Sequence, residues 1–552
     1  MTEMRRRIVA WMSVVALALA SSVTSLTNKY AYDDLSIIVN NDRIQSLAGW
    51  WHLWMQPYWP EHRGGGLYRP ITVLSFSLQW VVGNGDPVVF HVVSVVLYTL
   101  VCATVFWLAI QLFPLKFAWI AAALFAVHPL HVESVGNVVG QAELWAALFM
   151  ILAVAVFIRA RRRGSISVST TIVLVILYAL ACLSKEHGIV LPLLLVAAEL
   201  TLNRGGPPLR QRITMLRPLL LVLLLVGVAF LWVRSAVIPG TGDVVSALFV
   251  RETAYIRALT MLRVVLEWVR LFFWPAHLSA DYSPRHIDIA TGPTPEMLAS
   301  VVILLGVAAL AWTARRSVPV LTFAIAWVLV SLLIPSNLIV PTGFVLAERT
   351  LFLASVGVPL GIAAAVQRVH SRGELSTSSR AIAATAVAAL LVLGVARSAT
   401  RQRVWHDNEV LFAQTVRDAP ASYRAHLGYS LVLKTQKRHA EAFDELRLAH
   451  LIYPDNVNLL EYAGGEYSRM NRCPLAIPPF RRALEIDPGR ARSRHGLVAC
   501  LITLGQYREA KSEIVYGLAQ GGSRQAFERL RAVSDSLEAA GALRRPDRKI
   551  SP

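Results

Sequence analysis

The sequence has few cysteines and lacks the short motifs by which soluble enzymes bind nucleotides. Its 552 residues include four cysteines and no CxxC pair, which argues against a zinc site or a dithiol redox centre. The motifs GxxxxGK and GxGxxG are missing, as is an Asp-x-Asp pair that would hold a nucleotide sugar through a divalent metal. A cytosolic nucleotide-binding enzyme is therefore disfavoured. Cys473 and Cys500 would pair only in an oxidising compartment.

Charged residues are also scarce. Asp, Glu, Lys and Arg make up 16% of the chain, hydrophobic residues make up 55%, and the mean hydropathy is +0.51. This composition indicates a polytopic membrane protein with a soluble appendage rather than a soluble enzyme. The net charge of +19 fits Lys and Arg on cytoplasmic loops better than a nucleic-acid surface.

Eleven apolar segments are expected to cross the membrane as helices, and the predicted fold is all-α. The first, Ile8 to Leu26, follows Arg5-Arg6-Arg7 and is long enough for a bilayer core of ~20 residues. We interpret it as an uncleaved anchor rather than a signal peptide. The others lie near residues 90–112, 117–129, 142–160, 168–183, 188–203, 217–236, 298–314, 318–335, 350–369 and 381–399.

The basic loops between these segments predict the orientation of the chain. Counting eleven spans puts all of them on one side, which the positive-inside rule makes cytoplasmic. They are Arg159 to Gly164, Arg204 to Arg212, Arg315-Arg316 and His370 to Arg380. An odd number of spans places the C-terminal part outside. The preference for Arg over Lys and the many Ala and Val residues favour a bacterial inner membrane.

Three further stretches are expected at the membrane surface. Ile71 to Val82 is too short for a span and Tyr255 to Trp274 carries several charges, so both are predicted as interfacial or re-entrant helices. Gly49 to Trp59 contains four tryptophans and a tyrosine in eleven residues, which is typical of the headgroup layer. Stacking of these rings on a sugar is the alternative.

After Arg401 the sequence repeats every 34 residues. The recurring small, large and turn residues are Ala442, Ala476 and Ala510; Leu446, Phe480 and Ile514; Ala449, Ala483 and Gly517; and Pro454, Pro488 and Gly522. This pattern is typical of tetratricopeptide repeats, in which small residues let two helices cross closely. We predict a membrane domain at 1–400 and an extracytoplasmic α-solenoid at 401–552. The solenoid has three repeats at about 423–524 and a capping helix, Ser523 to Ala540.

The carboxylates of Asp33 and Asp34 stand side by side just outside the first span. Two like charges raise one another's pKa, and a less polar membrane face raises it further, so the pair is suited to accept a proton. The alternative is an N-cap for the helix that follows, because Asp accepts hydrogen bonds from free backbone N–H groups.

Three cations, Arg69, Lys185 and Arg349, lie in polar motifs at predicted outer membrane borders. The positive-inside rule disfavours cations there, so they are candidates to bind a lipid phosphate, although each alone could be a snorkelling boundary residue. Other residues of these border motifs are candidates for the wall of the site: Tyr68, His128, His131, Glu133, Gln141, Glu143, Glu186 and Glu348. His128, His131 and Glu133 have metal-like spacing, but Pro129 interrupts a regular helix, so a divalent metal is not favoured.

These motifs together resemble the transmembrane and tetratricopeptide repeat-containing O-mannosyltransferases, which are GT-C glycosyltransferases. The matching sequences are YDD, YRP, HPLHVESV, VVGQAE, LSKEHG, WPAHLSADYS, IPSN and AERTLF, followed by the repeats. The resemblance implies inverting transfer of mannose or a related sugar from a polyprenyl phosphate to Ser or Thr hydroxyls of secreted proteins. It matches Asp33 and Asp34 to the family's acidic pair, with Asp33 as the base. Gln141 departs from the family, which often has Arg there.

Two other functions remain open at this point. One is a GT-C transferase that modifies a glycolipid or polysaccharide, with the repeats recruiting a partner. The other is a membrane scaffold without catalysis, but scaffolding needs neither an acidic pair nor outer-face cations. A transporter is less favoured still, because few ionisable residues fall at the middle of a span. The expected co-substrate is a lipid-linked sugar, the expected partner of the repeats is an acceptor polypeptide, and no separate cofactor is expected.

Overall fold

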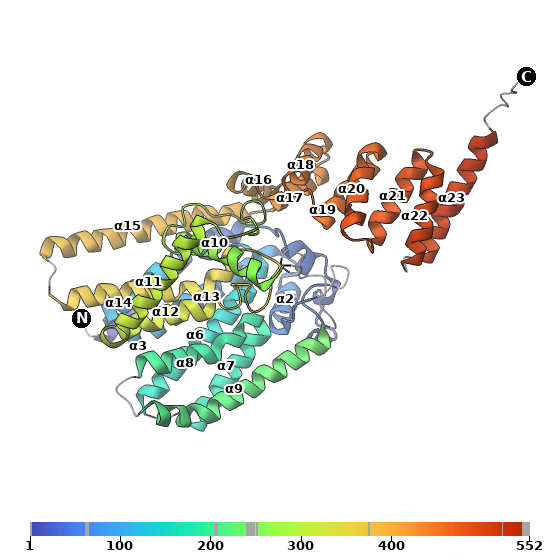
Figure 1. The fold of residues 1–552 in the computed structure, drawn as a ribbon. Helices are drawn as coiled ribbons and strands as arrows, with labels where there is room; N and C mark the ends of the chain where they lie inside the picture. Colours follow the sequence, from blue (N-terminus) through green and yellow to red (C-terminus); the bar gives the residue numbers. More distant parts are fainter. Residues whose placement is uncertain are drawn as a thin grey trace, which may run out of the picture. The chain divides into compact units, whose positions relative to one another are not determined.

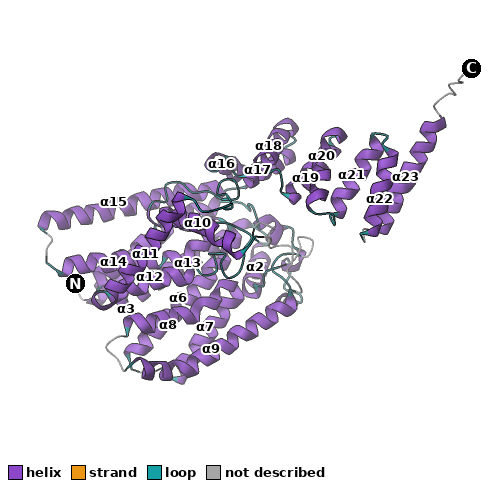
Figure 2. Ribbon diagram, viewed as in Figure 1, coloured by secondary structure: helices purple, strands orange, loops and turns teal. Residues whose placement is uncertain are grey.

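The structure is a computed structural model that describes residues 3–60, 66–164, 166–203, 208–238, 249, 252–373, 376–520 and 523–543. Within these residues the regular elements are helices and no strand occurs (Figure 2), so the predicted all-α class is confirmed. Residues 204–207 and 374–375 of the predicted basic loops, and Gly522 of the repeats, lie outside the described residues.

The chain folds into two compact units. The first contains Met1–Ser283 and Ile287–Asp418, and the second contains Pro284–His286 and Ala419–Pro552. Helix α16 (Asn408–Asp418) therefore packs with the first unit, although the predicted second domain starts at residue 401. The extra helix matters for the site, because Asn408 contacts the loop that carries the acidic pair.

In the described part of the chain, seven helical segments are long and apolar enough to cross a membrane. Their main helices are α1 (Glu3–Ser22), α3 (Pro87–Leu112), α6 (Gln141–Arg162), α9 (Leu209–Val237), α11 (Pro295–Ser317), α14 (Gly357–Ser371) and α15 (Thr377–Gln402); all but α1 are labelled in Figure 1. Helices of this length and composition belong to an integral membrane protein.

The remaining predicted spans are shorter helices. Helix α4 (Leu115–Ala126) and the segment Pro129–Gly136 form a pair bent by 48°, which would make an eighth span. The others are α7 (Val168–Ser184), α8 (Leu191–Leu202) and α12 (Pro319–Ser331). All eleven predicted segments are thus helical, but the count of eleven membrane crossings stays a prediction. The two apolar stretches assigned to the membrane surface form α2 (Pro70–Gly83) and α10 (Ala254–Phe273).

Local capping sets where several of these helices begin. At the start of α3 the Asp86 side chain accepts from the Val88 N–H at 2.9 Å, and Pro87 occupies the first turn. Ser167 and Ser376 cap α7 and α15 in the same manner. Away from the site, Glu199 of α8 is buried against Arg161 of α6 and Arg212 of α9, each with an Nε to carboxylate distance of 2.8 Å. This ion cluster ties three helices together.

The second unit is a series of helical hairpins, α17 (Tyr423–Thr435) to α22 (Tyr507–Ala519), closed by α23 (Arg524–Leu543). The first helices of the hairpins begin at Tyr423, Val457 and Ala491, so the 34-residue spacing of the sequence recurs in the structure. The second helices are α18 (His439–Ile452), α20 (Cys473–Ile486) and α22; the other first helices are α19 (Val457–Arg469) and α21 (Ala491–Thr503). The recurring Leu446, Phe480 and Ile514 are buried in its core.

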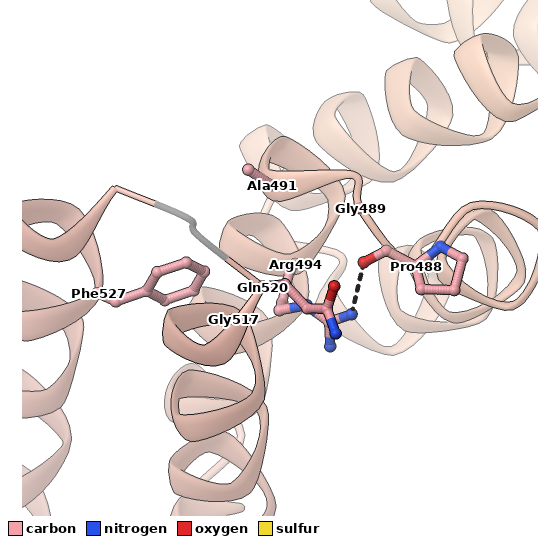
Figure 3. A pocket seen from close by; sticks show the side chains of 7 residues that line it. All are labelled: Pro488, Gly489, Ala491, Arg494, Gly517, Gln520 and Phe527. Atoms are coloured by element: carbon pink, nitrogen blue, oxygen red, sulfur yellow. Dashed lines mark hydrogen bonds between the residues drawn. The ribbon is translucent and has the colours of Figure 1, made fainter.

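A small pocket in the second unit (Figure 3) is lined by Pro488, Gly489, Ala491, Arg494, Gly517, Gln520 and Phe527. Arg494 donates to the Pro488 carbonyl at 3.0 Å and pairs with Glu513, so this arginine is already used within the repeat. Cys473 and Cys500 are buried free thiols whose side chains contact each other. They form no disulfide here.

Candidate functional site

The acidic pair lies in the loop between α1 and α2. Tyr32 has a left-handed backbone, with φ of +56°, and its N–H donates to Asn408 Oδ1 at 2.6 Å. The chain therefore turns sharply just before the two carboxylates. Asp34 precedes a short π-helical turn, Leu35–Val39, but its side chain forms no capping hydrogen bond there. The N-cap alternative is wrong for Asp34.

Asp34 is fully buried and held by backbone N–H groups. Its Oδ1 accepts from Val139 at 2.9 Å, and its Oδ2 accepts from Ala31 at 3.2 Å and from Val138 at 3.3 Å. Burial raises the pKa of Asp34 to about 7, against the lowering effect of these hydrogen bonds, and the charge of Asp33 adds to the rise. Asp34 thus ties the loop between α1 and α2 to the turn before α6.

We expect Asp34→Asn to destabilise the fold. The new amide NH2 group would face a backbone N–H donor and leave it without an acceptor, which costs about 1–3 kcal/mol of unfolding free energy. Thermal unfolding of the detergent-solubilised protein measures this loss. Asp33→Asn is the matched control and should unfold close to the wild-type temperature. Equal unfolding temperatures for the two variants would contradict the positioning role of Asp34.

Arg349 connects Asp33 to the HPLHVES motif. Its Nη1 donates to Glu133 Oε1 at 2.6 Å, and its backbone N–H donates to Glu133 Oε2 at 2.8 Å. Its Nη2 lies 3.8 Å from Asp33 Oδ2. The Asp33 side chain is 20% exposed, whereas Asp34 is fully buried. Asp33 is therefore the member of the pair that a substrate can reach.

Arg69 pairs with Glu186 and so joins the YRP and SKEHG motifs. The Arg69 Nε donates to Glu186 Oε2 at 2.9 Å, and the Tyr68 N–H donates to Glu186 Oε1 at the same distance. Burial raises the pKa of Glu186, but Arg69 and these hydrogen bonds outweigh it and leave the pKa below its usual value. The Tyr68 hydroxyl donates to the Trp54 carbonyl at 2.9 Å.

Lys185 pairs with Glu143 of α6, and His187 Nδ1 lies 3.5 Å from the same carboxylate. Burial lowers the pKa of Lys185 well below its usual value, and the charges of Arg69 and Arg349 lower it further. The charges of Glu186 and Glu133 act in the opposite direction on the same pKa, so Lys185 is within electrostatic reach of both neighbouring ion pairs.

Two glycines allow these motifs to approach so closely. A Cβ on Gly140 would lie 2.5 Å from the Ser134 carbonyl oxygen, so the GQAE turn packs directly on the HPLHVES backbone. A Cβ on Gly188 would lie 2.6 Å from the backbone of Ala181 at the end of α7. A side chain at either position would push the charged residues beside it out of place.

The two histidines hold a loop. His131 lies between the Tyr98 hydroxyl, 3.0 Å from Nδ1, and the Ser355 hydroxyl, 2.8 Å from Nε2. His128 Nε2 is 3.0 Å from the Phe272 carbonyl, and its Nδ1 accepts from the Leu130 N–H. Among the residues that the structure describes, no three His, Cys, Asp or Glu side chains are grouped to hold a metal.

Glu348 and Gln141 are also engaged with the protein. Glu348 Oε1 accepts from the Ser279 N–H and the Tyr282 hydroxyl, both at 2.6 Å, and so anchors the WPAHLSADYS loop. Gln141, where the resembling family often has Arg, exchanges two amide hydrogen bonds of 2.9 Å with Gln79 of α2. Sequence analysis missed Gln79, Ser279 and Tyr282 as partners, because single hydroxyl and amide residues carry no spacing signal.

The Gln141–Gln79 pair predicts the result of a double substitution. We expect Gln141→Leu alone to cost about 1–3 kcal/mol, because it leaves the buried amide oxygen of Gln79 without the donor that Gln141 supplies. Adding Gln79→Leu should recover part of this loss. Thermal unfolding of Gln141→Leu, Gln79→Leu and the double variant measures the interaction energy between the two side chains. A double variant that is less stable by the sum of the single losses would show that the two amides do not depend on each other.

The chain was compared with known proteins, and no protein-family profile matches it. It is 27% identical over 511 residues to mouse "Protein O-mannosyl-transferase TMTC3", covering 86% of this chain and 54% of that protein. Human TMTC3 is 26% identical over 518 residues, with 86% and 55% covered, and human TMTC4 is 27% identical over 480 residues, with 75% and 63% covered. The chain thus spans a little over half the length of the first two of these relatives.

Among solved structures, the chain aligns with the oligosaccharyltransferase of Archaeoglobus fulgidus. The apo form gives a TM-score of 0.39 at 15% identity, covering 71% of this chain and 56% of that one. The complex of the same enzyme, AglB, with an inhibitory peptide and a dolichol-phosphate gives 0.40 with the same coverage. Over most of its length the chain is a relative of the TMTC protein O-mannosyl-transferases, the group that its motifs resemble.

Proposed function

We propose that the protein transfers a sugar, mannose in the first instance, from a polyprenyl phosphate to a Ser or Thr hydroxyl of a polypeptide. The acceptor oxygen attacks the anomeric carbon, the bond from that carbon to the phosphate oxygen breaks, and the configuration inverts. The hydroxyl proton passes to a carboxylate and the polyprenyl phosphate departs. The observation that carries this proposal is a reachable carboxylate, Asp33, set 3.8 Å from the guanidinium of Arg349.

The roles of the residues follow from what each can reach. Asp33 is the base, because an alcohol with a pKa far above 7 needs a positioned acceptor for its proton. Arg69, Lys185 and Arg349 stabilise the departing phosphate, since charge that develops in the transition state is best met by fixed cations. Asp34 positions Asp33. In this proposal Glu133, Glu143 and Glu186 orient the three cations.

The unused donors of Arg69 support an anion site beside the three ion pairs. Each cation pairs with a glutamate, but Arg69 bonds to Glu186 through Nε alone, and within the described residues its two terminal nitrogens are left for another acceptor. Guanidinium groups bind phosphate oxygens through paired N–H donors. The chemistry therefore needs no metal, and a lipid phosphate is the anion we propose.

Transfer assays on the purified full-length protein test the proposed function. Polyprenyl-phosphate mannose and a Ser/Thr-rich polypeptide should give a mannosylated product by mass spectrometry. Product on a glycolipid or polysaccharide acceptor, with none on the polypeptide, would instead support the second transferase function. Absence of transfer to every acceptor, with normal folding, would favour a scaffold.

Sidedness is proposed from the eleven predicted spans, which place the acidic pair and the repeats outside a bacterial inner membrane. A fusion after Pro552 to a reporter that is active only outside the cytoplasm should be active. Activity of a cytoplasmic reporter alone would overturn this orientation.

The second unit is proposed to bind the acceptor polypeptide, because stacked helical hairpins present extended surfaces of the sort that repeat proteins use for peptides. We expect a chain that ends before Tyr423 to lose transfer to a protein acceptor while it retains most transfer to a short peptide. Equal loss on both acceptors would show that the repeats are needed for folding instead.

A further inference from the structure

Tyr58 lies in the tryptophan-rich loop and has a buried hydroxyl that no described residue satisfies. The residue is 2% exposed, and its phenol oxygen has no hydrogen-bond partner among the residues that the structure describes. A buried polar group left unpaired is costly, and native proteins keep few of them. The loop could have carried Phe at this position at less cost. The hydroxyl is therefore expected to serve a molecule that the free protein does not contain.

The surroundings of Tyr58 place it at the charged cluster. The Arg69 guanidinium lies 4.8 Å from the centre of the Tyr58 ring. The backbone N–H of Tyr58 donates to the Leu67 carbonyl at 2.8 Å, next to the YRP motif. Burial raises the pKa of Tyr58 above its usual value, so the phenol stays protonated and can donate a hydrogen bond. The charged groups that act on this hydroxyl are those of Arg69, Asp33, Asp34 and Arg349.

This set of neighbours includes both ends of the proposed reaction. Asp33, the proposed base, lies 3.8 Å from Arg349, and Arg69, a proposed phosphate-binding residue, covers the Tyr58 ring. The sugar that passes from the phosphate to the acceptor must lie beside these groups. We propose that the Tyr58 hydroxyl hydrogen-bonds a hydroxyl of the transferred sugar and so sets the sugar preference of the enzyme. This inference rests on the proposed function.

The test compares Tyr58→Phe with Tyr98→Phe in the full-length protein. Tyr98 is a buried tyrosine of α3 whose hydroxyl is satisfied by the Ala126 carbonyl and His131 Nδ1, each at 3.0 Å. We expect Tyr58→Phe to unfold at or above the wild-type temperature, because it removes only an unpaired group. Tyr98→Phe should unfold at a lower temperature. A drop for Tyr58→Phe as large as that for Tyr98→Phe would overturn the inference, because it would assign the hydroxyl a structural role.

Ligand-dependent unfolding isolates the sugar contact. Polyprenyl-phosphate mannose should raise the unfolding temperature of the wild type more than polyprenyl phosphate does, and the difference reports the sugar. Tyr58→Phe should lose this difference while it keeps the rise caused by polyprenyl phosphate. A difference that survives in Tyr58→Phe would overturn the inference.

Transfer from monodeoxy-mannosyl donors completes the test. We expect the wild type to discriminate roughly tenfold against the donor that lacks the contacted hydroxyl, and Tyr58→Phe to transfer both donors at similar rates. Unchanged discrimination against every deoxy donor would contradict the sugar contact. If the wild type neither transfers any sugar nor gains stability from either lipid, the proposed function itself fails. This outcome is distinct from failure at Tyr58 alone.

Discussion

Asp33→Asn is expected to lower turnover by about 10²–10⁴-fold while the protein still folds and binds its donor. Asn keeps the shape of the side chain, but its neutral amide cannot take up the proton of the attacking hydroxyl. The side chain of Asp33 is partly exposed beside Arg349, so an amide of the same shape can be accommodated there. Single-turnover transfer from polyprenyl-phosphate mannose, together with donor binding, separates lost chemistry from lost affinity.

The comparison with the neighbouring residue sharpens this result. Asp34→Asn should reduce activity through misplacement of the loop and should also lower the unfolding temperature, whereas Asp33→Asn should change turnover alone. Near wild-type turnover for Asp33→Asn would remove the catalytic assignment of Asp33, and with it the strongest residue-level support for an enzyme.

Arg349 is expected to give the second large effect, but only a paired substitution isolates it. Arg349→Ala leaves the buried Glu133 carboxylate uncompensated, which costs about 3–5 kcal/mol of stability. Arg349→Gln combined with Glu133→Gln removes both charges together. We expect this double variant to fold and to bind donor roughly tenfold or more weakly, because a charged hydrogen bond contributes about 1.5–3 kcal/mol.

A matched control is available in the second unit. Arg494→Gln with Glu513→Gln also removes a buried arginine and its glutamate partner, but within the repeats. Donor affinity of this control should equal that of the wild type. If the Arg349 and Glu133 double variant binds donor as tightly as the control, Arg349 is a structural residue and the phosphate site must lie elsewhere.

Sequence patterns predicted the helices well. Runs of apolar residues located the long helices of the first unit. The 34-residue spacing of small and large residues predicted the repeats, whose first helices begin at Tyr423, Val457 and Ala491. Sequence patterns predicted the packing of helix ends less well. Helix α16 carries no repeat signal and joins the first unit through contacts such as Asn408 with Tyr32, which link residues far apart in the chain.

In the candidate site, too, sequence motifs predicted the charged residues but not their partners. The border motifs named Arg69, Lys185 and Arg349, and in the structure each of them pairs with a glutamate. Their glutamate partners come from distant motifs, so no local spacing could reveal the pairing. Tyr58 was read only as one of several interfacial aromatic residues, because burial of its hydroxyl depends on how the loop folds.

The pairing of each cation with a glutamate has a consequence for how the donor reaches the site. Closed ion pairs project little field beyond a few ångströms, and solution ions screen what remains over about 8–10 Å at physiological salt. A water-soluble anionic substrate would gain nothing from such a short-range field, since fast capture from solution depends on long-range attraction. The proposed polyprenyl-phosphate donor is anchored in the bilayer and would arrive instead by lateral diffusion at a fixed depth. Its encounter rate with Arg69, Lys185 and Arg349 should therefore be almost independent of ionic strength.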